Sequence, residues 1–124
     1  SRVHACLPTR KERTAMPRVF IPSVPSRYDP LSQRHIPTID LSMAEAFGAL
    51  VPLVDLDASL RDTHAIAELK ARMREFESTD YILAAGDIVL VAAALAMACR
   101  AHGSAKVLRW DRLTRTYDCV EVNL

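Results

Sequence analysis

The sequence of 124 residues contains only three glycines, Gly48, Gly86 and Gly103, and they stand far apart. A G-x-G-x-x-G dinucleotide turn needs three closely spaced glycines, and a P-loop needs two glycines followed by Lys and Ser or Thr. Neither motif is present, and the G-x-S-x-G turn that carries the nucleophilic serine of α/β-hydrolases is also missing. These absences exclude the standard nucleotide cradles and a serine hydrolase of that type.

The sequence also has no large excess of charge of one sign, few cysteines and no long apolar run. Lys and Arg number 16 against 15 for Asp and Glu, so a net charge of +1 gives no general reason to expect a nucleic-acid or membrane partner. Cys6, Cys99 and Cys119 are odd in number and form no C-x-x-C pair, so we expect reduced thiols. The charge-free run 88–99 is shorter than the roughly 20 residues of a membrane span. We expect no metal, no cofactor and no membrane contact.

The length is that of one ordinary domain. Residues 1–15, "SRVHACLPTRKERTA", have no apolar period and precede "MPRVFIPS", which has the character of a natural start at Met16. We therefore expect a leader, a cloning remnant or an upstream extension at 1–15 and a single α/β domain at 16–124.

The first half of this domain predicts short elements and one long loop. Residues 19–21 predict a strand ended by Pro22, and the Pro-, Ser- and Arg-rich segment 22–37 predicts a loop. A capping box at Ser42 and Glu45 predicts a short helix that stops at Gly48. The next strand, "ALVPLVD", contains a proline and is therefore expected at a sheet edge or with a bulge.

The second half predicts longer elements. Apolar residues at steps of three and four predict an amphipathic helix from about Asp62, and residues 81–85 predict a buried strand. Residues 88–101 predict an apolar helix ended by Gly103, and 106–110 with 116–122 predict a hairpin. This order predicts an α/β fold with a small, mainly parallel sheet, helices packed on it in Rossmann-like layering, and a C-terminal antiparallel hairpin.

The helix at 88–101 has almost no polar face. Its many alanines, Ala92, Ala93, Ala94, Ala96 and Ala98, permit close approach of another element. We expect this helix to be either central in the fold or part of a homodimer contact.

Gly86-Asp87 ends a strand and begins a helix, which is where open α/β sheets place ligands. The alternative, which we favour, is that the Asp87 carboxylate caps the helix and fills that position itself. Acidic side chains near strand ends, Asp80, Asp87 and Asp111, raise a small metal-dependent hydrolase as a less favoured possibility. The spacing opposes it, because Asp80 and Asp87 flank opposite ends of one strand. The four histidines show no metal-ligand spacing, and His64 and His102 are expected on a helix surface and near a helix C-terminus.

"RWDRLTRTY" concentrates arginines and aromatic residues on the predicted hairpin. Such residues can stack on bases or hold an acidic partner. We favour the alternative that Trp110 and Tyr117 pack into the core and Asp111 pairs with an arginine.

The segments "MPRVFIP", "DLSMAEAFGALVPL", "DYILAAGD" and "KVLRWDRLTRTY" resemble a family of small proteins of tailed bacteriophages and prophages. That family has a D-[YF]-[IL]-L-x-x-G-D turn before an Ala-rich helix and a closing [KR]-W-D-R-x4-Y hairpin. This chain departs from it where Ile88 replaces a common proline. The resemblance covers Met16 to about Val122. It implies a phage product acting in the bacterial host cytoplasm, and it brings no activity with it.

We expect a phage-type accessory protein rather than an enzyme, which acts as a macromolecule-binding module for a host or phage protein. The alternative is a nucleotide or single-stranded nucleic-acid binder. The candidate binding residues are those of the closing hairpin, the strand-to-helix turn and the long loop: Arg109, Trp110, Arg112, Tyr117, Gly86, Asp87, Arg27, Tyr28 and Arg34.

Overall fold

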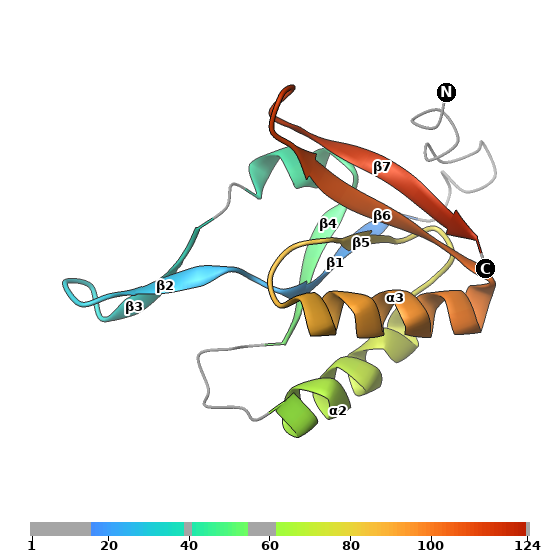
Figure 1. The fold of residues 1–124 in the computed structure, drawn as a ribbon, viewed down its shortest axis with the longest axis horizontal. Coiled ribbons are helices and arrows are strands. Elements are labelled where there is room, and N and C mark those ends of the chain that lie inside the picture. Colours follow the sequence, from blue (N-terminus) through green and yellow to red (C-terminus); the bar gives the residue numbers. More distant parts are fainter. Residues whose placement is uncertain (1–15, 39–40, 55–61, 124) are drawn as a thin grey trace.

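A computed structural model describes residues 16–38, 41–54 and 62–123 (Figure 1). The expectation for residues 1–15, with Cys6 among them, lies outside these ranges.

A five-stranded sheet of order β4-β1-β5-β6-β7 forms the centre of the fold. Its strands are β1 (Arg18–Ser23), β4 (Ala49–Val54), β5 (Tyr81–Leu83), β6 (Ser104–Asp111) and β7 (Thr116–Asn123). All neighbouring pairs are parallel except β6 and β7, which are antiparallel. The structure confirms the mainly parallel sheet, the C-terminal hairpin and the edge position of the proline-containing strand β4.

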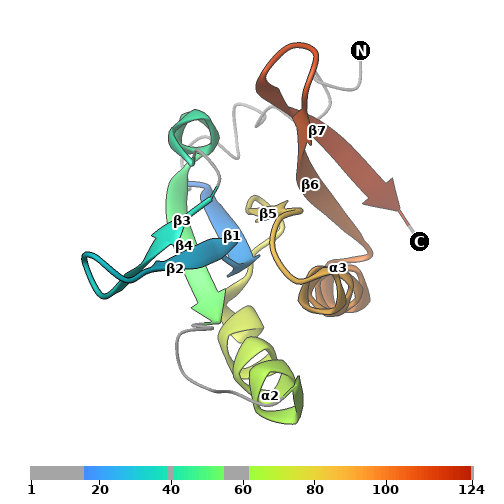
Figure 2. The ribbon, with the colours of Figure 1, turned by 60° about the vertical axis from the view of Figure 1, so that its left-hand side comes forward.

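Helices cover both faces of this sheet unequally. On one face lie α2 (Asp62–Arg72), which continues into η3 (Met73–Glu75), and α3 (Ile88–His102); they lie side by side in Figures 1 and 2. The short 3-10 helix η2 (Ser42–Ala46) covers the other face. The boundaries of α2 and α3 agree with the predicted helices, because apolar residues at helical spacing supply their buried stripes.

The sheet separates two hydrophobic clusters because side chains alternate along each strand. Phe20 and Ile82 point into the cluster beneath α2 and α3. Their neighbours in the sequence, including Val19 and Tyr81, point into the cluster beneath η2. The short strand β5 is buried on both faces, which explains its unbroken apolar sequence.

The predicted loop at 22–37 is wrong. Strand β1 continues through Pro22 to Ser23, and the chain then forms an antiparallel hairpin from β2 (Ser26–Asp29) and β3 (Arg34–Pro37). The carboxyl group of Asp29 accepts hydrogen bonds from Leu31 N and Ser32 Oγ, which fixes the turn. The hairpin projects from the body of the molecule in Figure 1.

Two further expectations are corrected. Leu41, not Ser42, occupies the position before η2, and it makes no side-chain capping bond, so the predicted capping box does not form. Cys99 is a free, buried thiol, as predicted, whereas Cys119 is disulfide-bonded and not reduced.

The outer side of α3 is exposed within the single chain. Leu90, Ala94 and Ala98 are buried against the sheet, whereas Ala92 and Ala96 are exposed. Burial of the whole helix within one chain is therefore wrong, and a homodimer contact through this side stays a prediction.

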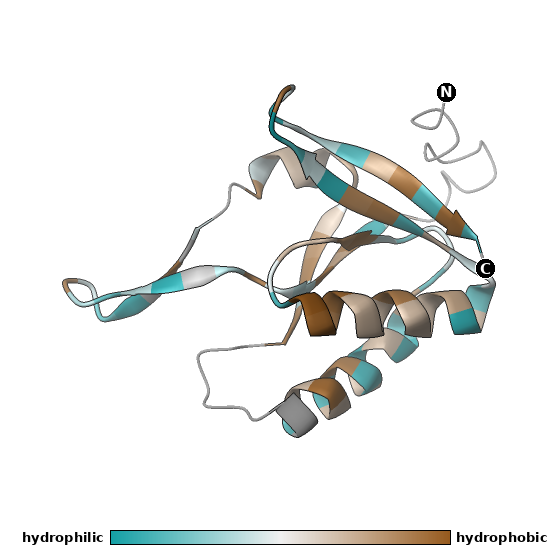
Figure 3. Cartoon of the chain, viewed as in Figure 1, coloured by the Kyte–Doolittle hydropathy of each residue, from teal (hydrophilic) through white to brown (hydrophobic). Residues whose placement is uncertain are grey.

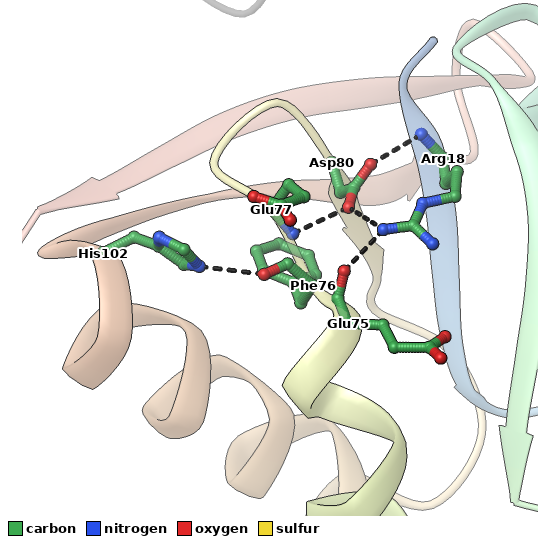
Figure 4. A network of polar contacts seen from close by, with 6 residues as sticks. All are labelled: Arg18, Glu75, Phe76, Glu77, Asp80 and His102. Atoms are coloured by element: carbon green, nitrogen blue, oxygen red, sulfur yellow. Dashed lines mark hydrogen bonds and ion pairs between the residues drawn. The ribbon is translucent and has the colours of Figure 1, made fainter. Parts of the chain in front are cut away.

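A polar network joins β1 to the loop before β5 (Figure 4). Asp80, only 1% exposed, accepts hydrogen bonds from the backbone N–H and the guanidinium of Arg18 and from Glu77 N. Arg18 also donates to the carbonyl of Glu75, and His102 contacts the carbonyl of Phe76. The network ties the amino end of the sheet to η3 and to the end of α3, so Asp80 has a structural role.

Candidate functional site

The turn between β5 and α3 is closed by its own side chain. Asp87 stands at the N-cap of α3, and its Oδ1 accepts hydrogen bonds from Val89 N at 2.8 Å and Leu90 N at 3.2 Å. The backbone N–H of Asp87 donates to Ser23 Oγ at 2.9 Å. The favoured capping role is confirmed, and protein oxygens occupy these three N–H groups at the position where α/β sheets often bind anions.

Gly86 brings the ends of β1 and β5 together. Its φ is +88°, and a Cβ added there would run into the backbone of Ser23. Only glycine allows both this backbone conformation and this close approach. The turn therefore requires glycine at position 86 for structural reasons. Gly86 is also one of the candidate binding residues.

A pocket of about 420 Å³ opens beside this turn. It is lined by residues from the base of the β2–β3 hairpin, the end of β5 and the closing hairpin: Pro25, Thr38, Ala84, Ala85, Gly86, Trp110 and Tyr117. Thr38 N donates to the carbonyl of Pro25 at 2.8 Å and holds the hairpin base at the rim. Two segments that the sequence singled out separately, the Gly86 turn and the Trp110 hairpin, therefore line one pocket at the carboxyl end of the parallel strands.

The closing hairpin only partly follows its prediction. Tyr117 is buried, but Trp110 is 41% exposed, so the expected burial of Trp110 is wrong. Their rings make an edge contact, with centroids 5.1 Å apart. Trp110 therefore presents an anchored aromatic surface to solvent at the pocket.

Charges on this hairpin pair differently from the prediction. Arg109 Nη2 lies 3.1 Å from Asp118 Oδ2, across the two strands. Asp111 instead accepts a hydrogen bond from Leu113 N at 2.9 Å, and this bond lowers the pKa of its carboxyl group. The side chain of Arg112 is exposed and has no ion pair within the part of the chain that the structure describes.

The candidate binding residues that the sequence placed in a loop at 22–37 lie on the β2–β3 hairpin. Arg27 pairs in register with Ile36, and Tyr28 and Arg34 lie on the facing strands nearer the turn. All of Arg27, Tyr28 and Arg34 are exposed. The hairpin starts at the pocket rim, so these residues extend the same end of the molecule.

Most of the exposed large apolar side chains lie on elements at this end. Among the described residues, nine large hydrophobic side chains are exposed, and seven belong to the β2–β3 hairpin, the first turn of α3 and the closing hairpin: Tyr28, Leu31, Ile36, Ile88, Val89, Trp110 and Leu113. Figure 3 shows the brown first turn of α3 and brown tips on both hairpins. We call these seven residues, with Arg27, Arg34, Arg109, Arg112 and the pocket, the carboxyl-end surface.

The acidic residues do not converge on a metal site. Asp80 and Asp87 lie at opposite ends of β5 and have separate hydrogen-bond partners. Within the described ranges, no group of three His, Cys, Asp or Glu side chains could hold a metal ion. His64 is exposed on α2 and His102 ends α3, as predicted.

The fold and this surface define a small α/β protein whose prominent feature is an apolar and arginine-bearing end. The chain matches the model of the Phage Pam3 gp32-like protein family over residues 17–124, and it belongs to that family. A search of curated proteins and a search of solved structures found no match. No helix among the described residues is long and apolar enough to cross a membrane.

Proposed function

We propose that this phage protein is an accessory binding module that recognises another protein, of the host or of the phage, through its carboxyl-end surface. The observation that carries this proposal is that seven of the nine exposed large apolar side chains among the described residues lie on the three elements that meet at the pocket. Exposed apolar groups cluster on monomers mainly where a partner covers them.

The composition of the surface suits a protein partner. Trp, Tyr and Arg are the residue types most enriched among the energetically dominant positions of protein interfaces. Trp110 and Tyr28 supply aromatic area, and Arg112 supplies an exposed cation beside it. The pocket next to Trp110, at about 420 Å³, is large enough to accept an apolar side chain from a partner.

A single-stranded nucleic acid is the second candidate ligand. Exposure of Trp110 beside three arginines of the same hairpin favours it, since bases stack on such rings. Two observations weaken it: Arg109 is paired with Asp118, and the described residues that line the pocket are all uncharged. Binding of this kind would weaken steeply with salt, whereas a protein interface with an apolar centre would persist.

The test is affinity capture from bacterial lysate with the full chain, with and without nuclease treatment. The variant Leu31→Ser/Leu113→Ser removes apolar side chains at the two hairpin tips, which are 97% and 96% exposed. Met16→Ser/Met43→Ser is the matched control, because it removes the two exposed large hydrophobic residues that lie elsewhere in the described chain.

We expect a nuclease-resistant partner that the tip variant loses and the control variant keeps. Loss of all retained material on nuclease treatment would instead assign the surface to nucleic acid. Equal retention by both variants would remove the basis of the proposal. We propose that the protein acts in the host cytoplasm. Capture repeated with the cytoplasmic fraction alone should then retain the same partner.

A further inference from the structure

A second hollow lies between α2 with η3 and the C-terminal half of α3, outside the carboxyl-end surface. Its volume is about 420 Å³, and residues of α2, η3 and α3 line it: Lys70, Met73, Arg74, Met97, Arg100 and Ala101. Each side contributes three residues at the spacing i, i+3, i+4, the first three from α2 with η3 and the last three from α3. One ridge of each helical segment therefore faces the groove.

The floor of the groove is apolar. Met73 is buried and Met97 is half-buried against the core beneath α2 and α3. Methionine side chains are flexible and adapt to different apolar partners, and for this reason they are frequent on surfaces that bind peptides. The floor can therefore receive an apolar side chain.

The rim of the groove is positive. Lys70, Arg74 and Arg100 are exposed, and none of them forms an ion pair with another described residue. None of the described residues that line the groove is a carboxylate. Two acids stand near the rim in the sequence: Glu68 is paired with Arg72 at 3.4 Å, and Glu75, which follows Arg74, turns its side chain away from α3 in Figure 4.

Cations near the ends of α2 and α3 also stabilise the helix dipoles. That effect explains positive charge in the last turns of the helices. It does not explain why three unpaired cations surround an apolar hollow floored by two methionines.

We propose that this groove binds an acidic segment of a partner protein, with carboxylates at the cationic rim and an apolar side chain seated on Met73 and Met97. Charge complementarity selects the acidic chemistry. The methionine floor favours a peptide over nucleic acid, because none of the described lining residues offers an aromatic ring for a base to stack on. The groove is separate from the carboxyl-end surface, so the chain would hold two partners or two parts of one partner.

The experiment is a titration of the full chain, with carbon-13 labelled methionine methyl groups, by a synthetic helical peptide that has a leucine stripe flanked by glutamates. We expect saturable NMR shifts at the methyls of Met73 and Met97. Met16 and Met43, both exposed elsewhere, are internal controls that should not move.

Two triple variants test the rim. Lys70→Gln/Arg74→Gln/Arg100→Gln should weaken binding on the order of tenfold, since three partly solvated ion pairs are lost. Lys70→Arg/Arg74→Lys/Arg100→Lys exchanges the same three side chains but keeps the positive charge of the rim, and it should leave the affinity unchanged within about twofold.

Three results would overturn the proposal: no saturable shift, equal weakening in both triple variants, or equally tight binding of a polyglutamate peptide without leucines. Tighter binding of a single-stranded oligonucleotide than of the peptide would assign the groove to nucleic acid. Each outcome is read at the methyl groups of Met73 and Met97, which lie outside the carboxyl-end surface, so the two proposals stand or fall separately.

Discussion

The backbone N–H of Asp87 donates a hydrogen bond of 2.9 Å to Ser23 Oγ, across 64 positions of the sequence. This bond closes the space between the carboxyl ends of β1 and β5. At this point the strand order changes direction, because β1 is followed in the sheet by β4 on one side and β5 by β6 on the other. In many α/β proteins a ligand lies at such a point. Here the serine hydroxyl and the Asp87 cap occupy it, so the exposed surface beside it is the part available to a partner.

The Gly86 turn should tolerate no side chain. Gly86→Ala adds a Cβ that collides with the backbone of Ser23 and forces alanine to a φ of +88°. Gly103→Ala is the matched control, because its φ is +82° but no heavy atom lies within 4 Å of the added Cβ. We expect the control to lose about 1–2 kcal/mol of unfolding free energy and Gly86→Ala to lose more than about 3 kcal/mol in urea titrations. Similar losses of unfolding free energy in the two variants would show that the close approach to Ser23 does not affect stability.

The buried Asp80–Arg18 pair should matter more than an exposed one. Asp80→Asn weakens the interaction with Arg18 and places an amide where two oxygens accept hydrogen bonds, so we expect a loss of about 2–4 kcal/mol. Asp118→Asn disrupts the exposed pair with Arg109 and should cost less than about 1 kcal/mol. Thermal or urea unfolding measures both, and equal small effects would contradict the structural role of Asp80.

Cys99 should make stability fall in alkaline solution. Burial raises the pKa of the Cys99 thiol above its ordinary value of 9.0. The thiol therefore favours the folded state fully below the unfolded pKa, and this contribution is lost as pH rises through the folded pKa. We compare unfolding free energies of wild type and Cys99→Ala at pH values on both sides of 9.0. The wild type should lose stability relative to the variant only above that pH, and a constant difference would refute the prediction.

Trp110 and Tyr117 should differ in what they contribute to folding. Trp110 is 41% exposed, so Trp110→Ala should cost about 1–2 kcal/mol, mainly the edge contact with Tyr117 and part of its burial. Tyr117 is buried, and Tyr117→Ala should cost about 3–5 kcal/mol. Melting temperatures measure the order. The opposite order would place Trp110 in the core and remove it from the proposed interface.

Local patterns predicted most of the sheet and helices. The run at 81–85, the helix at 88–101 and its end at Gly103 were predictable because burial on both faces, apolar character and a left-handed glycine each leave a local signal. The cap at Asp87 was predictable for the same reason. Each of these features depends on residues that are close in the sequence.

The β2–β3 hairpin was missed because its strands have little alternating apolar pattern and contain prolines at or beside their ends. The signal was the turn "DPLSQ", with Asp29 bonding to the following backbone and Gln33 at a φ of +56°. The Arg18–Asp80 network and the pocket could not be predicted, since they join residues that only the sheet order brings together. Trp110 was misplaced because it shares the core face of the hairpin with Leu108 and Tyr117, and its exposure depends on how far along β6 the core extends.

The most direct test of the account places a photo-reactive phenylalanine analogue at Leu113 or, in a second protein, at Met43, and irradiates living bacteria that express each. We expect a nuclease-resistant protein adduct from position 113 and none from position 43, because the first lies on the carboxyl-end surface and the second on η2. Adducts to nucleic acid from position 113, or the same protein adduct from both positions, would contradict a protein-binding surface at the carboxyl end of the sheet.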